Sequence, residues 1–396
     1  MPKLRVLTFT TLYPNEAMPS FAMFVEQRLR HLMASGEVDA RVVAPVPWFP
    51  FKCDRFGAYG RFARVPRHET RHGLSLSHPR YLVVPKIGMA LTSKTLYRAA
   101  ARAIERLIAG GFDFDLIDAH YLYPDGVSAA MLARKFKKPV VLTARGTDVN
   151  VIAKMPGPGR MVMDALNVAD GVVTVSAALR DALIGLGADS SKITVIRNGV
   201  DTTLFRETER EETRPKFGLE GRVLASVGNL VSLKGHDLVI RALAELPNTS
   251  LIIAGGGPLR GDLERLAKET GVSDRVRFLG AVPQSELPGI YSAADALVLA
   301  SSNEGLPNVI MEAIACGTPV IATKVGGIPE IITSREAGVL LDERNEKAIV
   351  EAVKALWASP PERSVTRALA EKFQWSETTA AQLKLFREIL ARRSHV

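Results

Sequence analysis

The sequence predicts an α/β protein built from two doubly wound domains, each a parallel sheet with helices on both faces. Short apolar runs rich in Val, Ile and Leu alternate with amphipathic stretches along nearly the whole chain, which is typical of buried parallel strands joined by helices. The chain has 396 residues, which is enough for two or three compact domains. Its composition, 47% hydrophobic and 23% charged, excludes a disordered chain, a collagen and a coiled coil.

This alternation defines two sets of elements. In the first half we expect strands at 3–9, 40–45, 114–120, 139–144, 171–176 and 193–198, and helices near 20–35, 92–109, 126–136, 160–169 and 177–186. In the second half we expect strands at 222–228, 249–255, 275–280, 296–301, 319–323 and 338–341, and helices near 235–246, 258–270, 284–293, 307–316, 345–357 and 376–392. The turn-prone stretch 198–219, which contains Gly199, Pro215 and Gly218, separates the two sets. Because such sheets bind ligands beyond the carboxyl ends of their strands, two facing halves predict a central cleft.

Positive charge is concentrated in the first half. Residues 1–200 carry 27 basic and 16 acidic side chains, and the remaining residues carry 24 and 26. This asymmetry indicates contact with an anionic partner or a general role in solubility. The chain has no recognisable nucleic-acid recognition motif, so we expect no nucleic-acid partner.

The cysteine count and the apolar runs suggest a compartment. Cys53 and Cys316 are too few for a disulfide framework or a four-ligand zinc site, which favours a reduced, cytoplasmic setting. We expect no signal peptide and no membrane-spanning helix, since no apolar run approaches the ~20 residues that a span needs.

The sharpest motif follows the expected strand 296–301 and leads into a helix. Gly305 lets the chain turn, and Pro307 suits the first helical turn, where its missing N–H costs nothing. The N–H groups near Asn308 and Val309 would then point outward at the positive end of the helix dipole. Such a site suits an anion, for example a diphosphate.

Two carboxylates flank this motif. Glu304 lies in the loop, and Glu312 lies one helical turn beyond Asn308 on the same face. Placed beside a phosphate site, they could accept hydrogen bonds from sugar hydroxyls. Alternatively, Glu304 only offsets the helix dipole and Glu312 is a solvated helix residue.

The spacing Glu304-x7-Glu312 resembles the signature of retaining glycosyltransferases with the GT-B architecture, in particular glycosyltransferase family 4. Five further segments follow the order of that family, and the segment 7–30 is similar to exopolysaccharide and teichuronic-acid assembly transferases. The five segments are VIRNGVD (195–201), SVGNLVSLKGHDLVIRAL (226–243), LIIAGGGPLRGDLE (251–264), FLGAVPQSELPGIYSAADALVLAS (278–301) and ACGTPVIATKVGGIPEII (315–332).

The resemblance implies a GT-B fold with two Rossmann-like domains that face a central cleft. We expect an acceptor-side domain at 1–203 and a donor-binding domain at 204–375, with residues 376–396 crossing back to the first domain. The apolar positions Ala380, Leu383, Phe386 and Leu390 recur at helical spacing and would form the buried face of this last helix.

The resemblance also implies donor-binding residues in the second domain. Lys234 would be the cation that binds the diphosphate, with no divalent metal. The family often has an arginine five positions earlier, where this chain has Asn229. Another basic residue, Arg145 or Arg197, could compensate for this difference.

The carboxylates and loops receive roles by the same analogy. Glu312 would hold the ribose hydroxyls, and Glu304 would contact the transferred sugar. Gly256 lies in a tight turn near the donor, and the backbone of Val282 would contact the nucleobase.

Two sites stand out in the first domain. His120 ends an expected strand and should project at the rim of the cleft, near the donor sugar in the analogy; alternatively it is structural. Arg145, Thr147 and Asp148 resemble the family's His-Gly-x-Asp motif with arginine in place of histidine. Arg145 could bind a phosphate bidentately, and Asp148 could contact sugar or acceptor hydroxyls or cap a helix.

These expectations add up to a retaining hexosyltransferase with catalytic residues His120, Lys234 and Glu304. It would move sugar from a nucleotide diphosphate sugar to a glycan or lipid-linked acceptor in cell-surface polysaccharide synthesis, without a cofactor. The alternatives are a nucleotide-sugar 2-epimerase of the same architecture and a donor-binding subunit without turnover.

A further expectation concerns the membrane surface. Residues 48–106 contain 12 Lys/Arg and 3 Asp/Glu, and aromatic residues alternate with cations from Trp48 to Arg64. This pattern favours reversible, peripheral contact with anionic lipid at the inner membrane face, or else a solvated loop.

Overall fold

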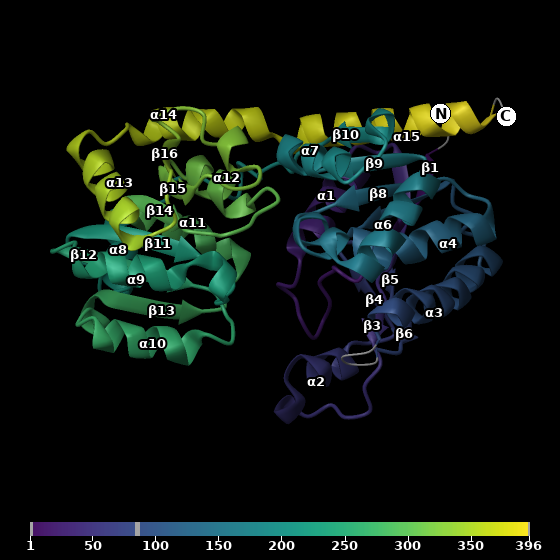
Figure 1. Ribbon diagram of the computed structural model, residues 1–396, viewed down its shortest axis with the longest axis horizontal. Coiled ribbons are helices and arrows are strands. Elements are labelled where there is room, and N and C mark those ends of the chain that lie inside the picture. Colours follow the sequence, from purple (N-terminus) through teal and green to yellow (C-terminus); the bar gives the residue numbers. More distant parts are fainter. Residues whose placement is uncertain (1–2, 84–87, 395–396) are drawn as a thin grey trace. The chain divides into compact units, whose positions relative to one another are not determined.

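The computed structural model describes residues 3–83 and 88–394, and the chain divides into two compact units. Unit 1 comprises Met1–Arg197 with Ser376–Val396, and unit 2 comprises Asn198–Trp375. Each unit is an α/β domain around its own mainly parallel sheet, as the alternation of apolar runs predicts (Figure 1).

Unit 1 contains an eight-stranded sheet in the order β10-β9-β8-β7-β1-β2-β5-β4. All neighbouring strands are parallel except β4 and β5, which form an antiparallel edge. The strands are β1 (Leu4–Phe9), β2 (Val38–Val43), β4 (His68–Arg71), β5 (Leu74–Ser77), β7 (Leu116–His120), β8 (Val140–Ala144), β9 (Gly171–Thr174) and β10 (Ile193–Val195), with a separate short pair of β3 (Val46–Pro47) and β6 (Arg80–Tyr81).

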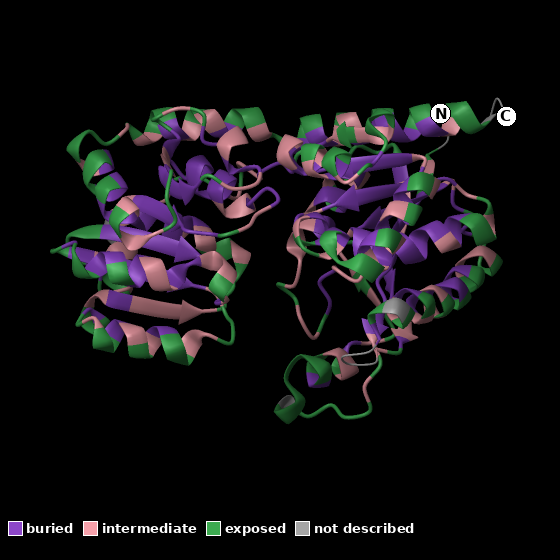
Figure 2. Cartoon of the chain, viewed as in Figure 1, coloured by how far each residue is buried: buried purple, intermediate pink, exposed green. Residues whose placement is uncertain are grey.

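Helices cover this sheet and leave one short helix standing away from it. Figure 2 shows that the central strands are buried, while α2 is largely exposed. The edge strands β4 and β10 contain only exposed and half-buried residues. The helices are α1 (Met23–Ala34), α2 (Gly57–Arg64), α3 (Met89–Ala109), α4 (Val127–Phe136), α5 (Thr147–Asn150), α6 (Pro156–Val168), α7 (Ala177–Gly185) and α15 (Trp375–Ser394).

Unit 2 contains a six-stranded, fully parallel sheet in the order β13-β12-β11-β14-β15-β16. This is the doubly wound order, in which β12 and β13 are added on one side of the first strand, β11, and β14 to β16 are added on the other side. The strands are β11 (Arg222–Val227), β12 (Thr249–Ala254), β13 (Val276–Gly280), β14 (Ala296–Leu299), β15 (Val320–Thr323) and β16 (Gly338–Leu341). The helices are α8 (Arg210–Lys216), α9 (His236–Ala244), α10 (Arg260–Glu269), α11 (Leu287–Ala293), α12 (Asn308–Ala315), α13 (Glu346–Ala358) and α14 (Arg363–Ala368).

The long helix α15 belongs to the core of unit 1 rather than to a loose tail. Its Leu383, Leu385, Phe386 and Ile389 are buried in one hydrophobic cluster with residues of the sheet such as Val141. The buried face therefore differs in part from the predicted one. Ala380 is exposed, and Ile389 is more deeply buried than Leu390.

Within the described residues, no helix has both the length and the apolarity that crossing a bilayer requires.

Replacing Phe386 should strongly destabilise unit 1. Its side chain is fully buried, so Phe386→Ala should reduce the free energy of unfolding by about 3–5 kcal/mol. Lys384 lies two residues away with an exposed side chain, and Lys384→Ala should change the stability by less than about 0.5 kcal/mol. Urea unfolding of the full chain measures both values, and equal stabilities of the two variants would contradict the packing of α15.

Candidate functional site

The predicted donor site of unit 2 lies at the topological switch point of its sheet. Strands β11 and β14 are neighbours, and their connections leave to opposite sides of the sheet. The loop after β11 carries Lys234, and the loop after β14 carries Glu304. Crevices at this position are where doubly wound sheets bind their ligands.

Two glycines let the first of these loops reach the second. At Gly235 (φ +70°), an added Cβ would lie 2.2 Å from the carbonyl oxygen of Ala300, at the end of β14. At Gly228 (φ +151°), an added Cβ would lie 3.6–3.8 Å from the aliphatic carbons of Lys234. The lysine side chain therefore lies along the backbone of the strand end, which fixes the direction of its ammonium group.

Lys234 and Glu304 form an ion pair across the switch point. Lys234 Nζ donates to Glu304 Oε1 at 2.6 Å, and the hydroxyl of Ser301 donates to the same oxygen at 2.7 Å. The side chains of Lys234 and Glu304 are only 19% and 10% exposed. Both groups are thus largely shielded from water, where an ion pair is screened less than on an open surface. Ser301, which the sequence analysis did not single out, fixes the carboxylate.

The backbone beneath Glu304 is equally constrained. At Gly326 (φ +54°), an added Cβ would lie 2.1 Å from the carbonyl oxygen of Glu304. The carbonyl oxygen of Gly305 accepts a hydrogen bond from Gly327 at 2.9 Å. The loop after β15 therefore holds the Glu304 loop in place.

Helix α12 begins directly after this loop. The sequence predicts Pro307 in the first helical turn, whereas in the structure it is the residue that precedes the helix. No side chain caps this end of the helix. Because helix α12 starts at Asn308, the backbone N–H groups of Asn308 and Val309 lie at the positive end of its dipole. The Asn308 side chain accepts a hydrogen bond from Asn198 Nδ2 at 3.0 Å.

Glu312 lies one turn further along α12 and is 7% exposed, so it is not a solvated helix residue. The hydroxyl of Tyr291, on α11, donates to Glu312 Oε2 at 2.8 Å. Burial raises the pKa of Glu312 from its ordinary value to about 7, although hydrogen bonds from Tyr291 and Gln284 oppose the shift. The carboxyl group therefore changes charge near neutral pH.

Three other predicted donor residues lie on adjacent loops at the same edge of the sheet. Asn229, Gly256 and Val282 follow β11, β12 and β13, respectively. The first two loops are joined by a hydrogen bond from Leu230 N to Gly256 O at 2.9 Å. His236 accepts from Ser226 Oγ at Nδ1 and donates through Nε2 to the carbonyl of Asn229. It is therefore a structural support for this edge.

In unit 1, the sequence analysis expected His120 to project at the rim of the cleft, but its side chain is buried. It is the last residue of β7 and is 1% exposed, with Nε2 3.3 Å from Asp118 Oδ2. Arg145 Nη2 lies 2.7 Å from His120 Nδ1, and its guanidinium group stacks over the ring of Phe24. Because a guanidinium group can only donate, His120 Nδ1 must be the acceptor and Nε2 carries the proton. Burial lowers the pKa of His120, which agrees with a neutral ring.

This cluster is connected to helix α15 by a chain of buried hydrogen bonds. Gln382 Nε2 donates to Asp118 Oδ2 at 2.9 Å, and Arg28 Nε donates to Gln382 Oε1 at 2.9 Å. All three side chains are buried. Sequence reasoning missed these residues, because nothing local in the chain signals contacts between positions so far apart.

Asp148 holds the loop after β8 instead of facing a ligand. It is fully buried, and its carboxylate accepts hydrogen bonds from the backbone N–H groups of Leu122, Arg145, Gly146 and Val149. Asp148 therefore binds backbone groups around its own loop rather than facing outward, and it does so from within α5, whose N-cap residue is Gly146. Thr147 beside it is exposed.

No group of three or more His, Cys, Asp or Glu side chains in the described parts of the chain is arranged to hold a metal ion.

Comparisons with known proteins agree with this organisation. The family described as "Glycosyltransferase Family 4" matches residues 59–204, and "Glycosyl transferases group 1" matches residues 208–373. The putative teichuronic acid biosynthesis glycosyltransferase TuaC of Bacillus subtilis is 30% identical over 358 residues, which are 88% of each chain. A D-inositol 3-phosphate glycosyltransferase of Mycobacterium tuberculosis is 33% identical over 300 residues, 70% of this chain and 62% of the relative.

Solved structures show the same fold. Sucrose-phosphate synthase from Thermosynechococcus elongatus superposes with a TM-score of 0.81 at 20% identity, over 98% of this chain and 100% of that chain. Anabaena HepE in complex with UDP and glucose superposes with a TM-score of 0.73 at 20% identity, over 100% of both chains. Both neighbours share the GT-B architecture predicted from the sequence. The family matches and the identity to TuaC along most of both chains show that this chain belongs to the family 4 (group 1) glycosyltransferases.

Proposed function

We propose that this glycosyltransferase moves a sugar from a nucleotide diphosphate sugar to an acceptor hydroxyl, with retention of the anomeric configuration and without a metal ion. The observation that carries the proposal is the ion pair of Lys234 and Glu304 beside the uncapped start of α12, at the switch point of the unit 2 sheet. The pair supplies a cation and a carboxylate where a diphosphate sugar would meet both.

The leaving group explains why these features belong together. When the bond between the sugar and the diphosphate breaks, negative charge develops on the phosphate oxygens. Lys234 and the N–H groups of Asn308 and Val309 are fixed donors that would stabilise this charge, as a metal ion does in other transferases. Glu304 keeps the lysine in position before the donor binds, and it then contacts the transferred sugar.

The rest of the unit 2 edge fits the nucleoside. Glu312 would accept hydrogen bonds from the two ribose hydroxyls, and Tyr291 fixes its orientation. The backbone of Val282 would contact the base, and the turn at Gly256 gives it room. The structures of HepE with UDP and with UDP-glucose support a nucleotide sugar as the donor class.

Unit 1 would supply the acceptor side. Arg145 is held by His120, and its guanidinium group would bind a phosphate or a sugar hydroxyl. His120 would then act chiefly by orienting Arg145, with Asp118 fixing the tautomer of its ring. Thr147 is exposed on the same loop, and its hydroxyl would contact the acceptor.

Retention is proposed to occur on one face of the sugar. The acceptor hydroxyl would pass its proton to a phosphate oxygen of the leaving diphosphate while its own oxygen forms the new bond to the anomeric carbon. This route needs no carboxylate nucleophile. The relatives named above are transferases, which does not favour the alternative of a nucleotide-sugar 2-epimerase.

The acceptor class we propose is a glycan or a lipid-linked sugar of cell-surface polysaccharide synthesis, on the cytoplasmic side of the membrane. TuaC is named for teichuronic acid biosynthesis, which supports this class. The segment from Trp48 to Arg64, here called the aromatic loop, would bring the enzyme to anionic lipid.

The geometry of the aromatic loop supports that role. Phe49 contacts the rings of Phe51, Phe56 and Tyr59, with centroids 5.2–6.0 Å apart. Trp48 and Phe51 nevertheless remain 52% and 56% exposed. The rings therefore pack on one another and still present an apolar surface, which is typical of side chains at a membrane interface.

The first prediction from this proposal tests the donor site. Glu304→Gln should lower kcat by about 10²-fold or more, because the fixed charge beside the reacting sugar is lost. The full chain is assayed with a panel of UDP-, GDP- and ADP-sugars in the presence of EDTA, and NMR gives the anomeric configuration of the product. The activity of the wild type should survive EDTA, and the product should keep the anomeric configuration of the donor sugar.

Glu351 on α13 is an exposed glutamate outside the site, so Glu351→Gln is the matched control and should keep full activity. Inverted product, loss of activity in EDTA, or unchanged turnover of the Glu304 variant would each remove a part of the proposal. Epimerised donor without acceptor would favour the epimerase.

The second prediction uses the raised pKa of Glu312, about 7. Below this pH the group is a neutral acid, and above it the carboxylate can accept hydrogen bonds from both ribose hydroxyls. The KM for the nucleotide sugar should therefore fall by about tenfold between about pH 6 and about pH 8, where the ionised fraction rises. The doubly esterified diphosphate has no group that titrates in this range.

Glu312→Gln should abolish this dependence on pH, whereas Glu351→Gln should retain it. A Glu312 variant with the same pH profile as the wild type would assign the titration to another group.

The third prediction concerns lipid. Replacing Arg55, Arg61 and Arg64 by glutamine should weaken binding to anionic vesicles by about 100-fold, at about 1 kcal/mol for each cation. Arg98, Arg134 and Arg160 are also exposed in unit 1, and their replacement by glutamine changes the net charge equally. Co-sedimentation at low and high salt compares the two triple variants. Equal losses would mean that only net charge matters.

A further inference from the structure

A second cationic site lies in unit 1, apart from the His120 cluster. A pocket of about 260 Å³ is formed between helix α3 and the segment where β5 leads into β6. Its cations are Arg67, Arg80, Arg102 and Arg106. On α3, Ala99 and Ala103 line the pocket with Arg102 and Arg106, so small side chains leave space beside the two guanidinium groups.

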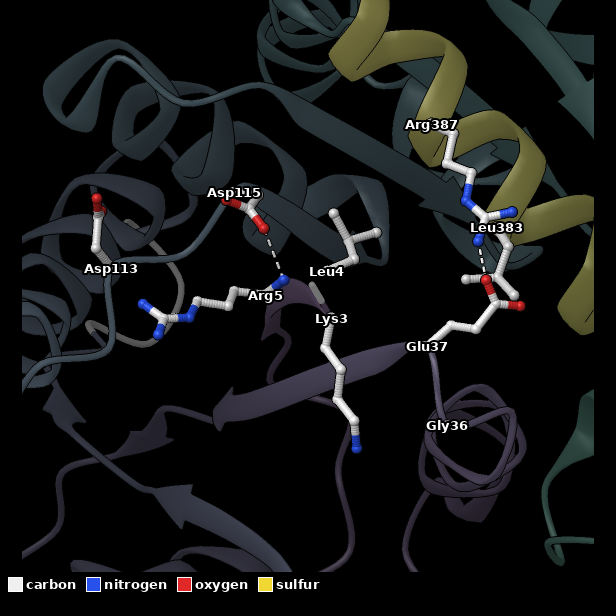
Figure 3. Close-up of a pocket in the computed structure, with 9 residues that line it drawn as sticks. All are labelled: Lys3, Leu4, Arg5, Gly36, Glu37, Asp113, Asp115, Leu383 and Arg387. Carbon is white, nitrogen blue, oxygen red and sulfur yellow. Dashed lines mark hydrogen bonds and ion pairs between the residues drawn. The ribbon is translucent and has the colours of Figure 1, made fainter. Parts of the chain in front are cut away.

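No carboxylate lines this pocket, and among the described residues none of its four arginines forms an ion pair. The ring of His78 is engaged on both sides, by Ala44 O at 2.8 Å and by Glu69 Oε1 at 2.9 Å, so it serves as a wall. Figure 3 shows a different pocket of unit 1, in which the basic residues have acidic neighbours. Glu37, Asp113 and Asp115 line that pocket together with its basic residues.

Arg80 is the most constrained member of the group. One nitrogen, Nη2, donates to the carbonyl oxygen of Val65, and Nη1 is buried without a hydrogen-bond partner among the described residues. Burial lowers the pKa of Arg80, and the like charge of Arg67 adds to this effect. A desolvated guanidinium group beside another cation is costly unless an anion compensates it.

We propose that this pocket binds the phosphate or diphosphate group of a phosphorylated acceptor. The inference deepens the proposed function, on which it rests. The forked donors of arginine match phosphate oxygens, and the small volume suits a compact anion rather than a whole sugar nucleotide.

The place of the pocket in the sheet fits an acceptor. The residues from His78 to Arg80 follow the carboxyl end of β5, at the same edge of the parallel strands where His120 ends β7. Strands β1 and β2 lie between them, so the two sites are separated by three strand spacings, about 14 Å. A phosphate bound there would anchor the acceptor away from the reacting hydroxyl, and binding energy at a remote group can serve the reaction.

The aromatic loop is directly connected to this pocket. Arg80 is on β6, which pairs with β3, and Trp48 follows β3 by one residue. Arg67 lies three residues after α2. A phosphate that belongs to a lipid would therefore be bound next to the surface that we propose to contact the membrane.

The test measures binding of inorganic pyrophosphate to the full chain by isothermal titration calorimetry. The double variant Arg102→Gln/Arg106→Gln removes two exposed cations of the pocket and should weaken this site at least tenfold. The matched control is Lys94→Gln/Arg98→Gln, which removes two exposed cations of the same helix that do not line the pocket. The control should bind as the wild type does.

Pyrophosphate can also bind at the donor site, so Lys234→Ala is measured alongside. Loss of one site in the pocket variant and of a different site in the Lys234 variant supports the proposal. A pocket variant that binds pyrophosphate like the wild type, or a control that loses as much, overturns it. If the pocket binds but no donor is ever turned over, the proposed function fails and the anion site remains.

Vesicles identify the source of the phosphate. Phosphatidic acid exposes a phosphate monoester, whereas phosphatidylglycerol has a diester, and the two are compared at equal surface charge. A preference for phosphatidic acid that disappears in the pocket variant assigns the site to a lipid phosphate. Pyrophosphate binding without this preference assigns it to a soluble phosphorylated acceptor, for which the variant should raise the acceptor KM and leave the donor KM unchanged.

Discussion

The close approach of backbones at the carboxyl edge of the unit 2 sheet is the constraint on which the donor site depends. At Gly235, Gly255 and Gly326, an added Cβ would lie 1.8–2.2 Å from a carbonyl oxygen of a neighbouring loop. No side chain can be accommodated at such distances. These contacts bring the loops after β11, β12, β14 and β15 together, and the pairing of Lys234 with Glu304 follows from them. The ion pair is therefore a consequence of backbone packing and does not have to pull the loops together itself.

The sequence predicted the parallel strands well because both faces of each sheet are covered. A strand such as Val140–Ala144 is buried at every position, and it appears in the sequence as a continuous apolar run. The edge hairpin of β4 and β5 was not predicted, because the polar run His68–Arg71 alternates between exposed and half-buried positions and carries no apolar signal. Helix α2 contains Gly57 and Gly60, which disfavour a helix on propensity alone.

The candidate site was predictable where local geometry defines it. Asn308 and Glu312 are four residues apart in one helix, so their spacing alone places them on one face, and Glu304 lies in the loop that leads directly into that helix. The supports of these residues come from elsewhere: Tyr291 reaches Glu312 from α11, and Gln382 reaches Asp118 from α15. Such pairs cannot be read from spacing. For the same reason the burial of His120 and Asp148 was missed, since it depends on which elements cover the end of a strand.

The positive charges of the two proposed anion sites are compensated in different ways when no anion is bound, and burial explains the difference. Lys234 is largely buried, where an unpaired ammonium group would be costly, and Glu304 compensates it until a diphosphate arrives. Arg67, Arg102 and Arg106 are exposed, so water can solvate them and no carboxylate is needed. Of the four arginines that line the pocket, Arg80 is the one that combines partial burial with the absence of a counter-charge among the described residues. An anion in that pocket would therefore gain most from Arg80, while the exposed arginines would attract it from solution.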